Sequence, residues 1–81
     1  MGLHLRIVSP VKVEYDGEVE SIVVPGTQGQ FEILKDHAPI ISSLEEGTVV
    51  YRIAEGNNIE LAILGGFVEV QKNVVSLCVE I

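Results

Sequence analysis

Hydrophobic and polar residues alternate along most of this chain with a period of two. Leu3, Leu5 and Ile7 fall on one side of an extended segment, and His4 and Arg6 fall on the other. This alternation predicts half-buried β-strands, because successive side chains of a strand point to opposite faces of its sheet. The same pattern recurs at residues 11–15, 19–24, 49–53, 59–63, 67–70 and 75–81.

Short turn sequences separate these segments. Asp16-Gly17 is predicted to form a two-residue hairpin turn, and residues 55–58 and 71–73 are predicted to form two further turns. Gly65-Gly66 interrupts a strand, as a bulge or a close backbone approach would. No segment keeps a helical period. We therefore expect one all-β domain over residues 1–81, a small antiparallel β-sandwich or flattened barrel of about eight to ten short strands.

One stretch, from Pro25 to Pro39, does not read as strand, turn and strand. Loops carry function more often than the strands that hold them, so we expect the functional surface here. Its start, Gly26 to Gln30, resembles a phosphate-binding loop but lacks the Gly-Lys-Ser/Thr ending and a following helix. Gly26 and Gly29 are therefore interpreted as turn residues, with Gly29 in a positive-φ conformation.

The charge of the chain narrows the choice of partner. Its 81 residues carry 12 carboxylates against five Lys and Arg, a net charge of −7. No two basic residues are adjacent, so nucleic acid and anionic membrane surfaces are poor partners. No apolar run approaches the roughly 18 residues of a membrane-spanning helix, and we expect no direct membrane insertion. A basic patch on another protein suits this charge.

The sequence offers little for catalysis or metal binding. His4 and His37 lack a partner at ligand spacing, and His4 is interpreted as a solvated side chain. The Ser42-Ser43 pair could approach His37 and Asp36, but no nucleophile elbow is present. Cys78, the only cysteine, is interpreted as a small core residue rather than a reactive thiol. We expect no catalytic residue, no metal and no cofactor.

Four blocks of the sequence, in order and with family spacing, resemble the epsilon subunit of F-type ATP synthases. The most specific is residues 25–41, PGTQGQFEILKDHAPII. There the family reads Pro-Gly-Thr-Glu-Gly-Glu-Phe, followed by a Gly-His-Ala-Pro turn and two aliphatic residues. Residues 3–10, 16–25 and 65–70 look like the family's first strand, second hairpin and closing strands.

The resemblance implies the N-terminal β-sandwich of a central-stalk (rotor) subunit. Such a domain packs against the gamma subunit and touches the polar loops of the membrane c-ring, within the F1 complex of alpha and beta subunits. It would couple ring rotation to ATP synthesis driven by a proton or sodium gradient, without catalysing a reaction itself. Its implied location is the cytoplasmic face of a bacterial inner membrane, held there through the complex, with the equivalent location in an organelle as the open alternative.

Three departures from the family pattern change these expectations. Family members continue into two C-terminal helices beyond the position of Ile81, so braking of hydrolysis and ATP binding are not expected of this chain. Gln30 stands where the family commonly has an acidic residue facing the c-ring. A charge-assisted pair becomes weaker there, unless Glu32 or Asp36 substitutes. Lys35-Asp36 replaces the usual Pro-Gly, so that turn can differ in type.

Site residues follow from the resemblance. Gln30 and Glu32 are assigned to the c-ring side and His37 to the gamma side, although His37 has a second open role, hydrogen bonding to the backbone of its own loop. Ile40 and Ile41 are adjacent, so one of them points outward from an extended segment; Ile41 is assigned to the gamma side. Structural roles, as turn residues or as an anchor, are assigned to Gly26, Gly29, Phe31, Pro39, Gly65 and Gly66.

Two other function classes stay open on the residues alone. A free-standing β-sandwich that binds a peptide or a glycan would need an aromatic platform, and this chain has two Phe and two Tyr, scattered. A small enzyme would need convergent polar residues, which the sequence does not offer. Co-purification with large ATPase subunits would favour the rotor subunit over both.

Overall fold

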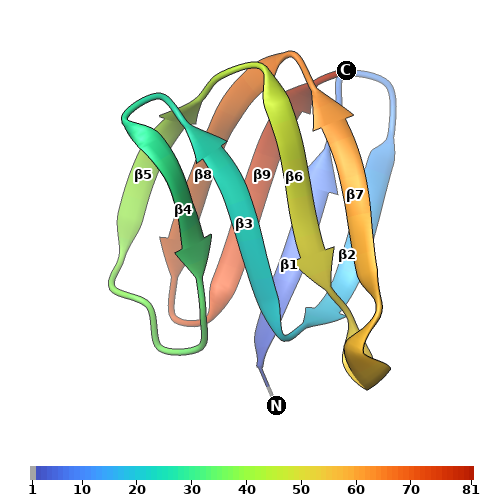
Figure 1. The fold of residues 1–81 in the computed structure, drawn as a ribbon, viewed down its shortest axis with the longest axis vertical. Coiled ribbons are helices and arrows are strands. Elements are labelled where there is room, and N and C mark those ends of the chain that lie inside the picture. Colours follow the sequence, from blue (N-terminus) through green and yellow to red (C-terminus); the bar gives the residue numbers. More distant parts are fainter. Residues whose placement is uncertain (1) are drawn as a thin grey trace.

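The computed structural model describes residues 2–81, apart from the side chain of residue 55, and folds them into strands and one short 3-10 helix (Figure 1). The elements are β1 (Leu3–Val8), β2 (Val13–Val19), β3 (Ser21–Gly26), β4 (Gly29–Ile33), β5 (Ile40–Leu44), β6 (Gly47–Arg52), η1 (Ala54–Gly56), β7 (Asn58–Ile63), β8 (Gly65–Gln71) and β9 (Val74–Glu80). Among these residues no helix has the length and apolar character to cross a membrane. The all-β prediction is confirmed.

The strands form one hydrogen-bonded sheet that folds over on itself into two layers. Its order is β2-β1-β9-β8-β5-β3-β6-β7, with β4 on the other side of β3. β3 and β5 meet at one residue pair, Gly26 with Leu44, and the sheet folds at this point. The back layer is β5-β8-β9-β1-β2 and the front layer is β4-β3-β6-β7 (Figure 1).

The pairing of β1 with β9 joins the two ends of the sequence. It is the parallel pair among the described strands, and the remaining pairs are antiparallel as expected. His4 lies opposite Val74 and Ile7 lies opposite Leu77. The alternation of residues along a strand is the same for both pairing directions, so the sequence pattern did not reveal this parallel pair.

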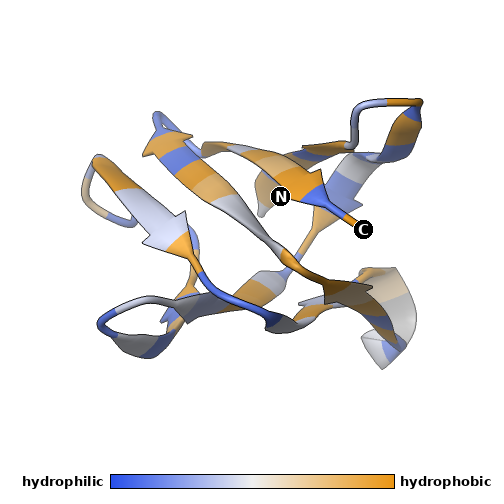
Figure 2. Ribbon diagram, turned by 90° about the horizontal axis from the view of Figure 1, so that it is seen from above, coloured by the Kyte–Doolittle hydropathy of each residue, from blue (hydrophilic) through white to orange (hydrophobic). Residues whose placement is uncertain are grey.

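The space between the layers is filled by one apolar core. Along β1 and β9 the inward residues are those that the alternation predicted, while the intervening residues face outward; Figure 2 shows the resulting bands of hydrophobic and hydrophilic ribbon. The described residues place no polar or charged side chain in the buried set. That set is Leu3, Leu5, Ile7, Val19, Ile22, Val24, Ile33, Leu44, Val49, Tyr51, Ile63, Val68, Val70, Val75, Leu77 and Val79.

The Asp16-Gly17 prediction was wrong, because this pair lies inside β2 rather than in a turn. Asp16 pairs with Arg6 and Gly17 pairs with Leu5. Gly17 is required by its neighbour: a Cβ there would lie 2.9 Å from the hydroxyl oxygen of Tyr15. The chain turns instead between β2 and β3.

The expectation that residues 25–39 are irregular was also wrong over the first half of the stretch. Pro25 and Gly26 end β3, and β4 returns antiparallel beside it, so within this stretch only the two-residue turn at 27–28 and residues 34–39 lie outside the strands. Pro25 fits in β3 because its pairing with β6 stops at Val23. The missing N–H of the proline therefore leaves no gap in that ladder. Gly29 has the predicted positive φ, 125°.

The two remaining turn predictions are confirmed in detail. Lys72 and Asn73 join β8 to β9 with φ of 52° and 63°, as in a two-residue type I′ hairpin. Residues 54–58 turn through η1. Of the two roles open to Gly65-Gly66, the structure has the close backbone approach: a Cβ on Gly66 would lie 2.1 Å from the carbonyl oxygen of Cys78.

Candidate functional site

The segment between β4 and β5, residues 34–39, is the longest one that projects from the layers at the lower end of Figure 1. It begins with a turn in which the backbone N–H of His37 donates to the carbonyl of Leu34 at 3.1 Å. Asp36, the third residue of this turn, has a φ of 64°. Positive φ at that position is typical of a type II turn, the type that Pro-Gly favours. Lys35-Asp36 therefore forms a turn of the type that a Pro-Gly pair favours.

Asn73 ties this loop to the neighbouring β8–β9 turn. The backbone N–H of Asp36 donates to Oδ1 of Asn73 at 2.6 Å, and Nδ2 of Asn73 donates back to Oδ1 of Asp36 at 3.1 Å. The two residues are 37 positions apart in the sequence. The loop is thus held by a neighbouring hairpin as well as by its own turn.

The ring of His37 hydrogen-bonds the backbone of its own loop. Its Nδ1 lies 2.7 Å from the carbonyl oxygen of Ala38, which accepts when that nitrogen carries the hydrogen. Of the two roles left open for His37, this contact realises the local one, and the ring remains half-buried. A role toward a partner is a separate matter and stays a prediction.

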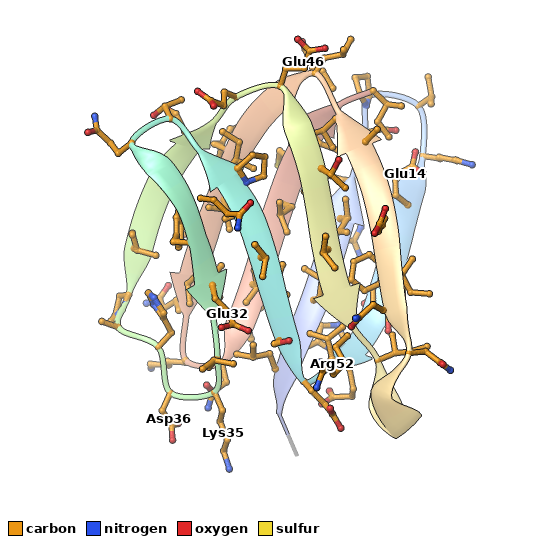
Figure 3. All side chains as sticks on the ribbon, in the orientation of Figure 1. Glu14, Glu32, Lys35, Asp36, Glu46 and Arg52 are labelled. Atoms are coloured by element: carbon orange, nitrogen blue, oxygen red, sulfur yellow. The ribbon has the colours of Figure 1, made fainter. Side chains whose placement is uncertain are left out.

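Gln30 and Glu32 lie together on the outer face of β4. Both are exposed, while Phe31 and Ile33 of the same strand point toward the core. Figure 3 shows Glu32 on β4, with Lys35 and Asp36 beyond the lower end of the strand. β4 pairs with β3 alone, so its other edge is open. The residues assigned to the c-ring side therefore share one exposed edge strand of the front layer.

Ile41 lies on the opposite layer. Of the two adjacent isoleucines, Ile40 packs against the core and Ile41 is the outward one, with 72% of its surface exposed. It sits on β5 opposite Glu69 of β8, on the outer face of the back layer. Phe67 of β8 is also exposed on this face. The residues assigned to the two proposed partner sides, Gln30 and Glu32 on one hand and Ile41 on the other, thus lie on opposite layers of the sandwich, with residues 34–39 connecting their strands.

An apolar row crosses the back layer beside Ile41. Phe67 pairs with Cys78, and Cys78 pairs with Val8, so their side chains share the outer face. With Pro10 they line a shallow hollow of about 560 Å³. The interpretation of Cys78 as a core residue was wrong, since its neighbours Leu77 and Val79 are the buried ones. The alternation of β9 already carried this signal, because inward 77 and 79 leave 78 outward.

The sequence analysis missed a charged cluster around His4. Nε2 of His4 lies 2.6 Å from Oδ1 of Asp16, and Nδ1 lies 3.4 Å from Oε2 of Glu18. Nη1 of Arg6 donates to the other oxygen of Asp16 at 3.2 Å. The hydrogen bond to Asp16, and then that to Glu18, raise the pKa of His4 above 6.5. The turn wrongly assigned to Asp16-Gly17 concealed this cluster, since it removed Asp16 from the strand opposite β1.

The arrangement offers binding surfaces rather than reactive groups. Within residues 2–81, apart from residue 55, no three His, Cys, Asp or Glu side chains gather to hold a metal ion. The ring of His37 bonds to the carbonyl of Ala38, and the hydroxyl of Ser42 donates to the carbonyl of Ser43, so these hydrogen bonds do not link His37 to the serine pair.

Comparison with known proteins gives consistent matches over nearly the whole chain. The family described as ATP synthase, Delta/Epsilon chain, beta-sandwich domain matches residues 2–81. The chain is 42% identical over 80 residues to the ATP synthase epsilon chain of Nostoc punctiforme, covering 98% of this chain and 58% of that protein. It is 43% identical over 76 residues to the epsilon chain of Leptospira borgpetersenii, covering 93% of this chain and 58% of that protein. The chain thus spans somewhat over half the length of these relatives.

Two solved structures share the fold. One is the Euglena gracilis mitochondrial ATP synthase, OSCP/F1/c-ring, with a TM-score of 0.90 and 22% identity over 95% of this chain and 49% of that chain. The other is the Tetrahymena thermophila mitochondrial ATP synthase, central stalk and c-ring, with a TM-score of 0.83 and 19% identity over 98% of this chain and 63% of that chain. At these identities the likeness establishes the fold alone.

Proposed function

This chain belongs to the ATP synthase Delta/Epsilon chain beta-sandwich family, and on that premise we propose that it is a non-catalytic part of the rotating central stalk of an ATP synthase. In this role, residues 1–81 act as one domain that contacts the gamma subunit and the c-ring. It passes rotation of the ring to the F1 complex of alpha and beta subunits, for ATP synthesis driven by a proton or sodium gradient. The observation that carries the proposal is the family match over residues 2–81.

The mechanical part of this role requires a body that resists deformation. The described residues place only hydrophobic side chains in the core between the layers. Close-packed interiors transmit strain rather than absorb it. A domain with such a core, bound by one partner on each of two faces, transfers force from one partner to the other.

The outer face of the back layer is the proposed gamma side. Ile41 and Phe67 are exposed there, and Phe67 lines the hollow together with Val8, Pro10 and Cys78. Protein interfaces gain most of their affinity from a few well-buried apolar or aromatic anchors. His37 lies in the adjoining loop, and its bond to Ala38 sets the ring's direction. These features support binding of an apolar patch of gamma.

The outer face of β4 is the proposed c-ring side. Glu32 supplies the carboxylate that Gln30 does not, and the net charge of −7 favours approach to a basic loop. A carboxylate paired with an arginine forms a stronger hydrogen bond than a neutral amide does. The contact therefore depends on Glu32 more than on Gln30.

The bacterial relatives support the proposed location. The relatives reported above include the ATP synthase epsilon chains of Nostoc punctiforme and Leptospira borgpetersenii. We place this chain with the membrane-associated ATP synthase, on the cytoplasmic face of a bacterial inner membrane, held there by its partners. ATP binding and a brake on hydrolysis are not proposed for residues 1–81.

The alternative, a free-standing recognition domain for a peptide or a glycan, is not favoured. Such a domain uses aromatic side chains gathered on one face. Here Tyr51 is buried, Tyr15 and Phe31 pack against the core, and Phe67 alone among the described aromatics is well exposed. The family match also points to the rotor subunit.

The test is reconstitution of an ATP synthase with variants of this chain. Glu32→Lys should weaken binding to the c-ring by about two- to five-fold and reduce coupled ion pumping, as expected for loss and reversal of an exposed ion pair. Gln30→Lys should have a smaller effect in the same direction. Glu60→Lys makes the same charge change on β7, at the other edge of the front layer, and should leave pumping unchanged. Unaltered pumping in both β4 variants would contradict the assignment of this face.

A further inference from the structure

Asp36 holds a backbone conformation that its side chain disfavours. Its φ of 64° lies in the left-handed region, where a Cβ approaches the following carbonyl and glycine is the usual residue. The described residues include three non-glycine positions of this kind, and the other two are Lys72 and Asn73. The hydrogen bonds reported above join Asp36 to Asn73, so the strained turn is held by another strained turn.

Asn73 is well placed to hold a neighbour because its own backbone is fixed. It occupies the second central position of the type I′ turn between β8 and β9, where φ is positive and asparagine is tolerated better than most non-glycine residues. Its carbonyl accepts from the backbone N–H of His4 at 2.9 Å, which ties the turn to β1. The side-chain amide therefore projects from a backbone anchored on both sides, by the hairpin and by β1.

The amide of Asn73 matches what Asp36 offers. One amide group supplies an acceptor, Oδ1, and a donor, Nδ2, and Asp36 presents a backbone N–H and a carboxylate oxygen. Both hydrogen bonds form: the backbone N–H of Asp36 donates to Oδ1 at 2.6 Å, and Nδ2 donates to the carboxylate at 3.1 Å. An aspartate or an alanine at position 73 could not make both bonds. The pairing is therefore specific to an amide side chain at this position.

We propose that Asn73 is the positioning residue for the loop of residues 34–39: its side chain keeps Asp36 in the left-handed conformation and so sets where His37, Ala38 and Pro39 lie. Asp36 directly precedes His37, whose N–H closes the turn. Release of Asp36 lets this turn relax toward a form that tolerates a Cβ, and the three following residues shift with it. The consequence for a partner rests on the proposed function, in which this loop adjoins the gamma side.

The test uses glycine to separate the side chain from the turn. Asn73→Gly keeps the positive φ of the β8–β9 turn but removes the side-chain amide. Asp36→Gly places at position 36 a residue that adopts a positive φ without the two hydrogen bonds from Asn73. In Asn73→Gly, hydrogen exchange at the Asp36 amide should rise by roughly two- to ten-fold, the range expected for one lost hydrogen bond. Lys72→Gly, in the same turn, should leave that amide unchanged.

Gamma binding is the second readout, measured by calorimetric titration with a gamma fragment. Asn73→Gly should weaken it several-fold, and the Asp36→Gly/Asn73→Gly pair should bind as Asp36→Gly alone does, since glycine at 36 holds the turn unaided. Unchanged exchange at Asp36 in Asn73→Gly would overturn the positioning role. Raised exchange with unchanged gamma affinity would support that role and overturn the assignment of the loop to gamma. If Asn73→Gly does not fold, Asn73→Asp keeps the turn, sets two carboxylates together and should displace the His37 resonances.

Discussion

Gly66 of β8 lies directly against the backbone of Cys78 of β9. In the β8–β9 ladder Cys78 is the pairing partner of Phe67, the residue that follows Gly66. A Cβ built on Gly66 would fall 2.1 Å from the carbonyl oxygen of Cys78 and 2.9 Å from Cα of Val79. The φ of Gly66 is also positive, 145°. Two independent constraints, space and backbone conformation, thus require glycine at this position. Gly65 shares neither, since its Cβ would meet Leu44 at an ordinary 3.6 Å.

Substitution of the two glycines should therefore give different results. We expect Gly66→Ala to lower the free energy of unfolding by about 2–4 kcal/mol, because β8 and β9 must separate locally to admit the methyl group. Gly65→Ala should stay within about 1 kcal/mol of the parent. Urea unfolding of both variants measures the difference. If both substitutions destabilise the domain equally, the close approach of Gly66 to Cys78 does not explain the need for glycine at position 66.

Gly17 provides a second test, of the corrected course of β2. The ring of Tyr15 covers Gly17, its hydroxyl donates to the carbonyl of Glu18 at 3.0 Å, and it packs on Tyr51 with ring centroids 4.6 Å apart. Gly17→Ala should displace the ring and cost about 1–2 kcal/mol. In a Tyr15→Leu background the same substitution should cost less, which a double-mutant cycle by urea unfolding detects. Additive effects would argue that residue 17 does not lie beneath Tyr15.

The fold was largely predictable because the buried face of each strand appears in the sequence as an alternation of apolar and polar residues. Once one face was assigned to the core, Leu3, Leu5 and Ile7 could point only toward it. Asn73 is a residue type that tolerates the positive φ of a tight hairpin turn. Asp-Gly misled because the same dipeptide favours a turn and also permits a tyrosine ring to lie over the glycine. Local sequence does not distinguish the two uses; the partner strand does.

The candidate site was less predictable than the fold, for a related reason. The alternation predicted that one of Ile40 and Ile41 points outward, but not which one. In the structure Ile40 packs against the core, so Ile41 is the outward residue. The hydrogen bonds between Asn73 and Asp36 join two turns that are 37 positions apart in the sequence, so no local pattern contains them. Contacts between elements arise from the topology, and a single sequence does not record the topology directly.

The His4 cluster predicts a pH-dependent contribution to stability. Hydrogen bonds to Asp16 and Glu18 raise the pKa of His4 in the folded chain above 6.5. Protonated His4 therefore stabilises the fold fully below pH 6.5, and this contribution is lost as the pH rises through the folded pKa. Arg6, the other basic residue of the cluster, donates to the second oxygen of Asp16.

The measurement compares urea unfolding of the parent and His4→Gln below pH 6.5 and well above the raised pKa of His4. The stability difference between the two proteins should be larger at the lower pH and shrink at the higher one. Glu18→Gln should reduce the pH dependence partly and Asp16→Asn more strongly, in the order of their effects on the pKa of His4. The contact is exposed, so high salt should diminish the difference. A pH-independent difference would contradict an ionised His4.

The adjacent isoleucines of β5 allow the gamma-side assignment to be separated from stability. Ile41 is 72% exposed, so Ile41→Asp should leave the unfolding free energy within about 0.5 kcal/mol of the parent. It should nevertheless weaken binding to a gamma fragment by roughly ten-fold, because a carboxylate would be buried in an apolar contact. Ile40→Asp, one residue away, makes the same chemical change on the side that packs against the core. It should destabilise the domain by about 2 kcal/mol or more. Calorimetric titration and urea unfolding on the two variants give both quantities, and unaltered gamma affinity in Ile41→Asp would place the partner on another face.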